Sequence, residues 1–344
     1  MVNKSIDLVF HSAQLDHFQE RDWINFLFSK IKFNEYTINN WKPKNEILSI
    51  HIFSSNDKIE FNLAKDLFLS FQNQNISYAI FHLSDEWARE DTSFYRGAKF
   101  CLRINWCPFI SNPAIFYIPW GPVHYFSMPV SSSVLIASKR KYLASFVGRI
   151  KQARPELEKH FGNQSKFFIY DSGKDKKMTH DEYYNAYFQS IFTLCPNGNA
   201  NPETARFYEA LECGSIPITE HSFSIDYYKE LLGPNPIPSF RSWSKAKEWI
   251  LKNNEEKFLD QLQQEVNNWW KAKKNSYQDL IPKMINNNSN SLNSYNSPYK
   301  GISLSIMWRF HLLRYLKLKY FPKEFLIWLK RNFFCKLTFY RLNI

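Results

Sequence analysis

The sequence predicts an α/β protein built from two successive units in which strands and helices alternate. Short apolar runs that end in turn residues alternate with segments whose apolar residues recur at helical spacing, a pattern typical of mostly parallel sheets covered by helices. At 344 residues the chain is long enough for two domains of ordinary size. Its composition, 44% hydrophobic and 18% aromatic, is that of a globular protein.

The first unit is predicted over residues 1–128. Its strands are short apolar runs, and its first helix carries Trp23, Phe26, Leu27 and Ile31 at helical spacing. We expect strands at 6–10, 47–53, 78–83, 99–104 and 115–118, and helices at 22–33 and 63–71. Prolines, a glycine and a serine run near residue 125 indicate a crossing into a second domain.

The second unit is predicted over residues 129–285 and repeats the alternation. We expect helices at 133–142, from Pro155, and at 181–189, with strands at 145–147, 166–170 and 192–195. A helix and a further strand then lead to residue 218. This last segment is the most informative one in the chain.

The helix after residue 200 has the features of an anion-binding helix start. Asn201 is a candidate N-cap, Pro202 suits the first helical position, and Glu203 lies in the first turn, before Thr204. Free N–H groups at such a start can hold a diphosphate or a sugar. Gly214 is expected to end the helix.

Two charged residues follow on the same helix. Arg206 comes one turn after Glu203, near enough to contact the same anion, and Glu209 stays on that face of the helix. The Glu209 carboxylate could accept two hydrogen bonds from the hydroxyls of a ribose. Isolated Glu and Arg residues more often lie on a solvated helix face, so the interpretation depends on the order of strand, turn, helix, glycine and strand around them.

A cationic loop follows the strand that ends at Gly148. Arg149 and Arg154 are placed where a diphosphate could be neutralised, because open α/β sheets bind ligands at the carboxyl ends of their strands. The alternative is an ordinary solvated basic loop. The chain contains neither a P-loop nor a G-x-G-x-x-G pattern.

Residues 206–218, R-F-Y-E-A-L-E-C-G-S-I-P-I, resemble the R-x-x-E-A-L-x-x-G-x-I-P-V signature of exostosin-type (GT47-like) glycosyltransferases. Residues 145–157 are similar to the segment that opens the nucleotide-binding domain of that family, and stretches between 81 and 121 are similar more loosely. Ser215 departs from the family pattern, which commonly has Cys. The resemblance implies a GT-B arrangement of two Rossmann-like domains facing a cleft, with the acceptor bound by the first and the nucleotide sugar by the second.

The function that the resemblance implies is transfer of a sugar from a nucleoside diphosphate sugar to a hydroxyl of a glycan or glycolipid, with inversion of stereochemistry and without a metal. The alternatives are a fucosyltransferase-like enzyme that uses a GDP-sugar, and a non-catalytic glycan- or nucleotide-binding protein of the same fold. No Asp-x-Asp is present, so we expect no metal and no cofactor besides the donor substrate. The predicted donor site comprises Gly148, Arg149, Arg154, Asn201, Glu203, Thr204, Arg206 and Glu209.

The catalytic base is expected at the carboxyl edge of the first sheet. Asp85 and Glu86 follow the strand 78–83, and either carboxylate could accept the proton of the attacking hydroxyl. His11 and His82 compete for the role. We expect Asp85 or Glu86, without choosing between them.

The C-terminal part has a different composition. Residues 286–298 are polar and rich in Asn and Ser, which predicts a flexible linker. Residues 299–344 hold ten lysines or arginines and one acidic residue, interleaved with aromatic residues. A basic, aromatic, amphipathic helical tail fits an anionic membrane surface, with about 1 kcal/mol for each cation. Packing on the protein body and nucleic-acid binding are the alternatives, and we expect no nucleic acid.

The expected location is cytoplasmic, at the inner face of a membrane. The five cysteines are an odd number without zinc-site spacing, which favours a reducing compartment. We find neither a signal peptide nor an apolar run of about twenty residues in the sequence. The protein is therefore expected to lie on the membrane through its tail rather than to span it.

Overall fold

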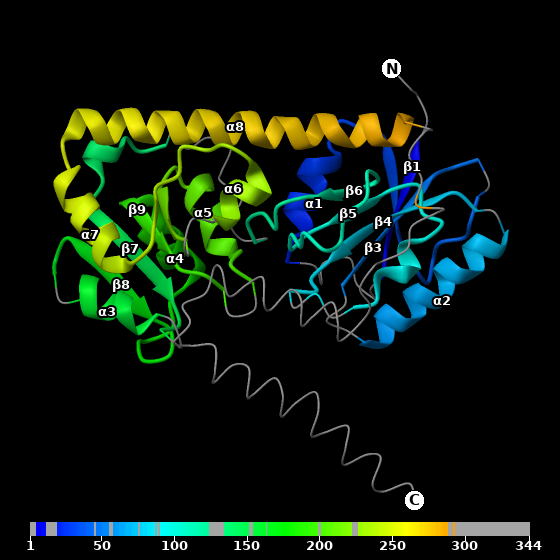
Figure 1. Cartoon of the computed structure of the whole chain (residues 1–344), viewed down its shortest axis with the longest axis horizontal. Coiled ribbons are helices and arrows are strands. Elements are labelled where there is room, and N and C mark those ends of the chain that lie inside the picture. The colour runs from blue at the N-terminus through cyan, green and yellow to red at the C-terminus, as the bar shows by residue number, and fades with distance from the viewer. Residues whose placement is uncertain are drawn as a thin grey trace, which may run out of the picture.

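The computed structural model describes residues 5–11, 19–44, 46–54, 58–74, 76–86, 88, 90–123, 134–150, 154–162, 164–198, 201–221, 226–287 and 292. These residues form two α/β domains side by side, with a long helix, α8, along both (Figure 1). The two predicted α/β units are thus confirmed. The predicted tail, 299–344, lies outside the described residues.

The first domain contains, in the described part of the chain, a six-stranded parallel sheet in the order β2-β1-β3-β4-β5-β6. Its strands are β1 (Ile6–Phe10), β2 (Phe33–Thr37), β3 (Ser49–Ser54), β4 (Tyr78–Leu83), β5 (Cys101–Arg103) and β6 (Ile115–Tyr117). Its helices are α1 (Arg21–Phe28), α2 (Lys58–Gln74) and the 3₁₀ turn η2 (Thr92–Tyr95). Every residue of β1 and β4 is buried, as expected for central strands of a sheet covered on both faces.

The second domain contains, within the described residues, a five-stranded parallel sheet in the order β11-β10-β9-β7-β8. Its strands are β7 (Tyr142–Gly148), β8 (Phe167–Asp171), β9 (Ser190–Cys195), β10 (Ile216–Glu220) and β11 (Ser239–Phe240). Its helices are α3 (Pro155–Phe161), α4 (His180–Phe188), α5 (Ala205–Glu212), α6 (Tyr227–Leu232) and α7 (Trp243–Lys252). The carboxyl ends of β7, β8 and β9 meet at one edge, where the candidate site lies.

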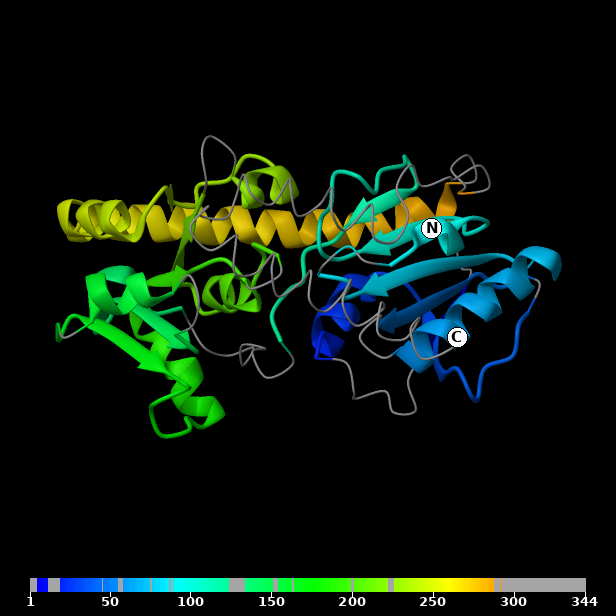
Figure 2. The ribbon, with the colours of Figure 1, turned by 60° about the horizontal axis from the view of Figure 1, so that its bottom comes forward.

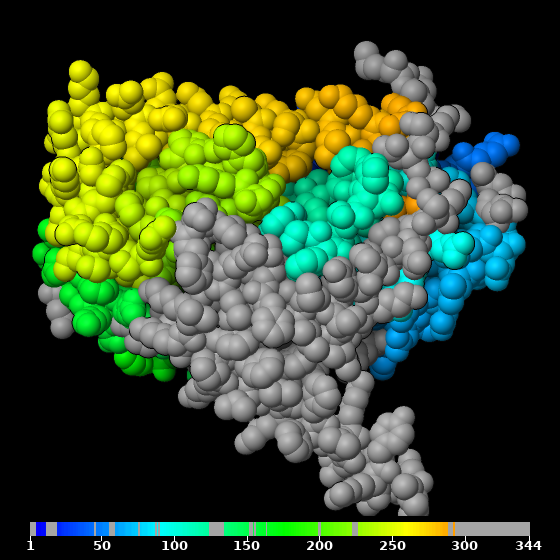
Figure 3. Space-filling view, viewed as in Figure 1, coloured from blue at the N-terminus to red at the C-terminus, as the bar shows by residue number. Residues whose placement is uncertain are grey.

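The helix α8 (Glu256–Asn286) runs along both domains, as two views of the ribbon agree (Figures 1 and 2). In the space-filling view it forms one continuous edge of the molecule (Figure 3). Near its start, Gln263 Nε2 donates to Gly214 O of the second domain at 2.7 Å. Near its end, Gln278 Nε2 donates to Phe26 O of the first domain at 3.0 Å. The predicted boundary at residue 285 assigned this helix to the second domain, whereas its last turns pack on the first.

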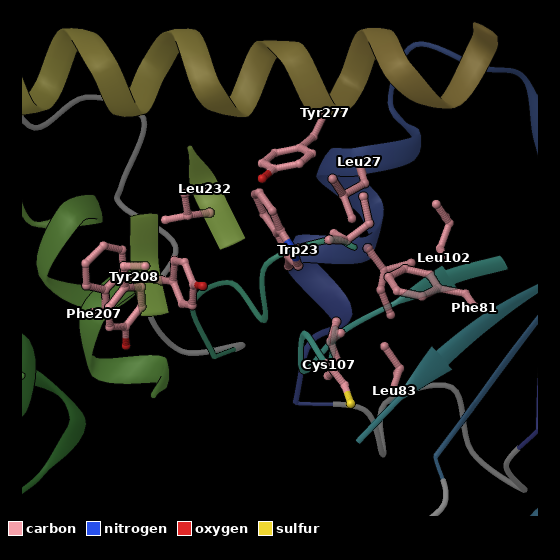
Figure 4. Close-up of a cluster of buried hydrophobic side chains, with 14 of the residues drawn as sticks. Trp23, Leu27, Phe81, Leu83, Leu102, Cys107, Phe207, Tyr208, Leu232 and Tyr277 are labelled. Carbon is pink, nitrogen blue, oxygen red and sulfur yellow. The ribbon is translucent and has the colours of Figure 1, made fainter. Parts of the chain in front are cut away.

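The hydrophobic core is continuous across the domain boundary. Trp270 of α8 stacks on Trp23 of α1, with ring centroids 6.1 Å apart, and its ring lies 5.8 Å from that of Tyr208 in α5. Tyr277 of α8 and Trp23 lie between the two halves of the same buried cluster (Figure 4). The two sheets therefore share one large core cluster, beside which the second domain has a small cluster of its own.

Two predicted elements differ from the structure. Residues 22–33 were expected to be one helix, but α1 ends at Phe28 and Phe33 begins β2. This edge strand, Phe-Asn-Glu-Tyr-Thr, is mostly half-exposed and polar, so it lacks an apolar run in the sequence. The strands 6–10 and 78–83 match the prediction because their apolar runs are continuous.

The helix predicted at 133–142 is wrong. Its described residues contain one 3₁₀ turn, η4 (Ala137–Lys139), and Tyr142 already begins β7. Side chains of α8 hold the turn: Asp260 Oδ1 accepts from Ser138 N, and Gln263 Oε1 from Ala137 N, both at 2.8 Å. The buried Arg140 guanidinium donates to four carbonyl groups, those of residues 135, 187, 190 and 213. These tertiary contacts override the local helical spacing.

The predicted flexible linker 286–298 begins inside α8, which ends at Asn286. Leu292, described further along it, is fully buried. Its N–H donates to Ala98 O at 2.9 Å, and its carbonyl accepts from Gly97 N at 3.3 Å. At this position the chain is packed on the first domain rather than free.

Candidate functional site

A cavity of about 380 Å³ opens at the carboxyl edge of the second sheet. Its walls come from the ends of β7 and β8, from the segment that leads into α4, and from α5. Val123, on the crossing between the domains, completes it. Three of the predicted donor-site residues line it together: Gly148, Arg206 and Glu209. The helix face that carries Arg206 and Glu209 is therefore turned toward a cavity.

Gly148 is required where β7 meets Arg206. Its φ is +145°, and a Cβ built there would lie 2.5 Å from Arg206 Nη2. The Arg206 Nε donates to Val147 O at 3.0 Å, and its guanidinium lies 4.7 Å from the centre of the Phe146 ring. Burial alone would lower the pKa of Arg206, but the neighbouring Tyr187, Tyr183, Cys195 and Glu209 raise it overall. The guanidinium is held in place and stays charged.

Glu209 is 2% exposed although it lines the cavity. Its Oε2 accepts a hydrogen bond from the Tyr183 hydroxyl of α4 at 2.7 Å. Burial raises the pKa of Glu209, while the Tyr183 hydrogen bond and the Arg206 charge oppose the rise. Tyr183 was not predicted as a site residue, because no sequence pattern indicates that a side chain of α4 contacts Glu209 on α5.

The helix start differs from the prediction. α5 begins at Ala205, and Thr204, not Asn201, is the N-cap residue. Asn201 Oδ1 instead accepts from Glu203 N at 3.0 Å, which closes a turn before the helix. Asn201, Glu203 and Thr204 are all buried and none of them lines the cavity.

Glu203 connects the two domains. Its Oε1 accepts from Trp120 N of the crossing segment at 2.8 Å and also from the Tyr208 hydroxyl. Its Oε2 accepts from the Tyr227 hydroxyl at 3.2 Å. Burial raises the pKa of Glu203 to about 7, which these hydrogen bonds oppose and the nearby Glu86 reinforces. The Glu203 side chain therefore stabilises the junction between the two domains.

Arg154, one of the two predicted loop cations, does not line the cavity but lies near enough to Arg206 to interact with its charge. It donates to Arg149 O at 3.0 Å and to Asn197 O, after the end of β9, at 3.4 Å. Burial and then the charge of Arg206 lower the pKa of Arg154 to about 10. Two neighbouring guanidinium groups favour an anion between them. Arg149 lies beside Gly173, outside the residues that line the cavity.

Asp85 and Glu86, in the turn after β4, have different surroundings. Ser84 and Asp85 both have left-handed backbone, with φ of 66° and 61°. Asp85 Oδ2 accepts from Arg103 Nη2 at 2.7 Å in a buried ion pair. Glu86 is half-buried, and burial raises its pKa. Within the described part of the chain Glu86 accepts no hydrogen bond, so of the two carboxylates it is the one available to a substrate.

The competing histidines are enclosed in the first domain. His11 Nε2 pairs with His51 Nδ1 at 2.9 Å, and burial lowers the pKa of His11 to about 3. His82 is fully buried and its Nδ1 lies 2.6 Å from the Tyr95 hydroxyl. Burial, and then the Arg103 charge, hold the pKa of His82 well below its usual value. Neither imidazole is placed to meet a substrate in this structure.

The described residues contain neither a candidate metal site nor a candidate membrane-spanning helix. No group of three or more His, Cys, Asp or Glu side chains there could hold a metal ion. No helix among them combines the length and apolar character that crossing a membrane requires. The cysteines that the structure describes (Cys101, Cys107, Cys195 and Cys213) are all free and buried.

Comparison with known proteins finds similarity in the half of the chain that carries the cavity. A protein family described as the RXYLT1 C-terminal domain matches residues 123–290. The chain is 32% identical over 151 residues to ribitol-5-phosphate xylosyltransferase 1 of Homo sapiens, over 40% of this chain and 34% of that protein. It is 32% identical over 124 residues to the protein of the same name from Danio rerio, over 33% of this chain and 28% of that one. The chain thus spans about a third of the length of these relatives.

A solved structure of similar outline is an alpha-glucosyltransferase in complex with UDP-glucose and DNA containing an abasic site. It has a TM-score of 0.48 and 10% sequence identity, and covers 82% of this chain and 99% of its own. The family match over residues 123–290 covers the second domain and α8. The more specific exostosin-type resemblance stays a prediction.

Proposed function

We propose that this protein is a GT-B-type glycosyltransferase that moves a sugar from a nucleoside diphosphate sugar to an acceptor hydroxyl. The observation that carries the proposal is the meeting of Gly148, Arg206 and Glu209 at one cavity, at the carboxyl edge of a parallel sheet. The similarity of residues 123–290 to the C-terminal domain of a xylosyltransferase supports it, because that stretch includes all three residues.

The donor would lie with its diphosphate near Gly148, Arg206 and Arg154. The absence of a side chain at Gly148 lets a phosphate approach the backbone, and the two guanidinium groups offer charge-assisted hydrogen bonds. Glu209 would accept hydrogen bonds from the ribose hydroxyls. Asn201, Glu203 and Thr204 are buried outside the cavity, so we assign them to shaping the α5 start rather than to donor contact.

The transfer would proceed by attack of the acceptor oxygen on the anomeric carbon of the sugar. The bond from that carbon to the diphosphate oxygen breaks, and the diphosphate leaves with the electron pair. Glu86 would take the proton of the acceptor hydroxyl, since a half-buried carboxylate with a raised pKa is suited to that task. Arg206 and Arg154 would stabilise the charge on the leaving group. A single displacement of this kind inverts the anomeric centre and needs no metal.

The sugar and acceptor are proposed from the relatives. Their name, ribitol-5-phosphate xylosyltransferase, favours a pentosyl donor and an acceptor hydroxyl on a glycan that carries a polyol phosphate. A hexosyl donor, or a GDP-sugar in a fucosyltransferase-like reaction, is the competing assignment. Attachment to the cytoplasmic face of a membrane is proposed on the basic aromatic composition of residues 299–344 alone.

The test begins with thermal unfolding of the full chain in the presence of UDP, GDP and CMP. A ligand at one hundred times its dissociation constant stabilises the folded state by about 2.7 kcal/mol. We expect one nucleoside diphosphate to raise the melting temperature, Arg206→Ala to abolish that rise, and Glu209→Gln to reduce it. Lys245→Ala, at an exposed position of α7, serves as the control. A chain that no nucleotide stabilises would contradict the proposal.

Turnover separates an enzyme from a binding protein. UDP-xylose, UDP-glucose and GDP-fucose are offered with polyol phosphates and glycans, and released nucleoside diphosphate is measured. Glu86→Gln is expected to lose turnover while it still binds the nucleotide, because the proposed base does not contact the donor pocket. Nucleotide binding without release of any product would favour the non-catalytic alternative.

A further inference from the structure

The two oxygens of the Glu209 carboxylate have different surroundings. Oε2 accepts the Tyr183 hydroxyl at 2.7 Å. Among the described residues Tyr183 is the one side chain that donates to Glu209, and both residues line the cavity. The predicted bidentate contact of this carboxylate with a ribose therefore has to be shared with a protein hydroxyl that already occupies one of the oxygens.

Tyr183 is itself held at the cavity wall. It lies on α4, whose first turn is closed by a capping box between Thr179 and Glu182. Its ring packs on that of Tyr187 with centroids 5.1 Å apart, and the two hydroxyls are 3.3 Å from each other. A short, fixed helix thus presents the hydroxyl to Glu209, and the hydroxyl cannot turn away without loss of these contacts.

The contacts continue to the cationic side of the cavity. The Tyr187 hydroxyl lies 3.5 Å from Val147 O, and Val147 O accepts from Arg206 Nε at 3.0 Å. The acidic and basic groups of the cavity are therefore connected through α4 and the end of β7. A carboxylate fixed in this way has a defined orientation in which to accept further hydrogen bonds.

We propose that Tyr183 is a positioning residue that orients the Glu209 carboxylate toward the cavity and so makes the site select ribonucleotides over deoxyribonucleotides. This inference rests on the proposed donor site. With Oε2 fixed by Tyr183, Oε1 and the remaining lone pair of Oε2 are directed at neighbouring hydroxyls of the ligand. A sugar that lacks one hydroxyl leaves a buried carboxylate oxygen without its partner, which is costly.

The electrostatics agree with this geometry. Burial raises the pKa of Glu209, and the hydrogen bond from Tyr183 lowers it. Tyr183 thereby favours the ionised form, which accepts hydrogen bonds at both oxygens. Removal of the hydroxyl should make Glu209 protonate at a higher pH. Ligand affinity should then begin to fall at a higher pH as the solution is acidified.

The experiment compares the full-length wild type with Tyr183→Phe, using calorimetric titration of UDP and 2′-deoxy-UDP, or GDP and 2′-deoxy-GDP if GDP is the nucleotide that binds. The wild type should bind the ribonucleotide about tenfold more tightly than the deoxy form. Tyr183→Phe should lose most of that preference, because the variant should bind the ribonucleotide more weakly than the wild type does. The acid midpoint of ribonucleotide binding should move to higher pH in the variant.

Two further variants keep the outcome interpretable. Tyr184→Phe removes a hydroxyl from the next residue of the same helix, whose ring packs on Phe188 outside the cavity lining, and should behave as the wild type. Glu209→Gln should lose the same preference for the ribonucleotide. The double variant with Tyr183→Phe should lose no more of this preference than either single variant, because both changes act through one carboxylate.

The outcomes separate the inference from the proposed function. Should Tyr183→Phe bind the ribonucleotide with the wild-type preference and the wild-type pH midpoint, the positioning role is overturned and the donor site stands. Additive effects of Tyr183→Phe and Glu209→Gln would overturn it equally. A wild type that binds neither UDP nor GDP would remove the donor site, and the inference with it.

Discussion

Single residues decide whether the cavity can accept a ligand, and Gly148 is the most constrained of them. We expect Gly148→Ala to destabilise the protein by about 1–3 kcal/mol, because the backbone is strained for any other residue and the new methyl group meets Arg206. Displacement of the guanidinium should also weaken nucleotide binding. Chemical denaturation and thermal shift with the bound nucleotide measure the two effects.

Gly233→Ala is the matched control for that change. Gly233 has a φ of +76°, but a Cβ there would meet nothing within 4 Å. The control should therefore show the backbone strain without any loss of nucleotide binding. Equal binding losses in the two variants would mean that the Arg206 contact is not the reason for the glycine.

The buried ion pair of the first domain gives a second prediction at this scale. Asp85→Ala leaves the Arg103 guanidinium buried without its partner, and we expect a loss of about 3–5 kcal/mol in unfolding free energy. Asp279→Ala breaks an exposed pair with Lys30 and should cost less than about 1 kcal/mol. Urea denaturation compares them. A small loss for Asp85→Ala would contradict its structural role and restore it as a candidate base.

At the scale of elements, Trp270 of α8 contacts both domains. Trp270→Ala should destabilise the protein by about 3–5 kcal/mol, since its ring packs on Trp23 and Tyr208 and its Nε1 donates to Glu212 at 2.8 Å. Trp269→Ala, at a partly buried neighbouring position, should cost clearly less. Equal losses of unfolding free energy in the two variants would show that the contacts of Trp270 with both domains do not make it more important for stability than Trp269.

The elements also show which features a sequence reveals. β4 was predicted with its correct bounds, because a strand buried on both faces is a continuous apolar run. The start of α5 was placed early, because Asn201-Pro202-Glu203 has the composition of a helix cap while the Asn201 side chain closes a separate turn. The Tyr183–Glu209 contact joins residues 26 positions apart, and no local pattern encodes it. The packing of α8 along both domains was not predicted, because contacts between segments far apart in the chain leave no local sequence pattern.

At the scale of the whole molecule, Glu203 links the domains and should make their stability depend on pH. Its pKa is about 7 in the folded protein, above the usual value of 4.5 for a glutamate, so the folded state binds more protons between these values. The contribution of this group to stability is then fully present below about pH 4.5 and is lost as the pH rises through 7, by up to about 3 kcal/mol. Glu203→Gln should flatten this dependence.

Denaturant midpoints at pH 5 and pH 7.5 measure the effect. The groups around Glu203 are the Trp120 N–H, the hydroxyls of Tyr208 and Tyr227, and the Glu86 carboxylate, whose own pKa is raised by burial. Because Glu86 titrates nearby, Glu86→Gln is the control that isolates the contribution of Glu203. An unchanged pH slope in Glu203→Gln would exclude this residue as its source.

The packing of Trp270 against both domains has a consequence for how the protein melts. Neither sheet can lose its order while the other keeps an intact set of neighbours, so the two halves should come apart in one cooperative transition. Scanning calorimetry should record a single heat-absorption peak whose calorimetric and van't Hoff enthalpies agree. In Trp270→Ala the peak should split or broaden, as each half regains its own melting temperature.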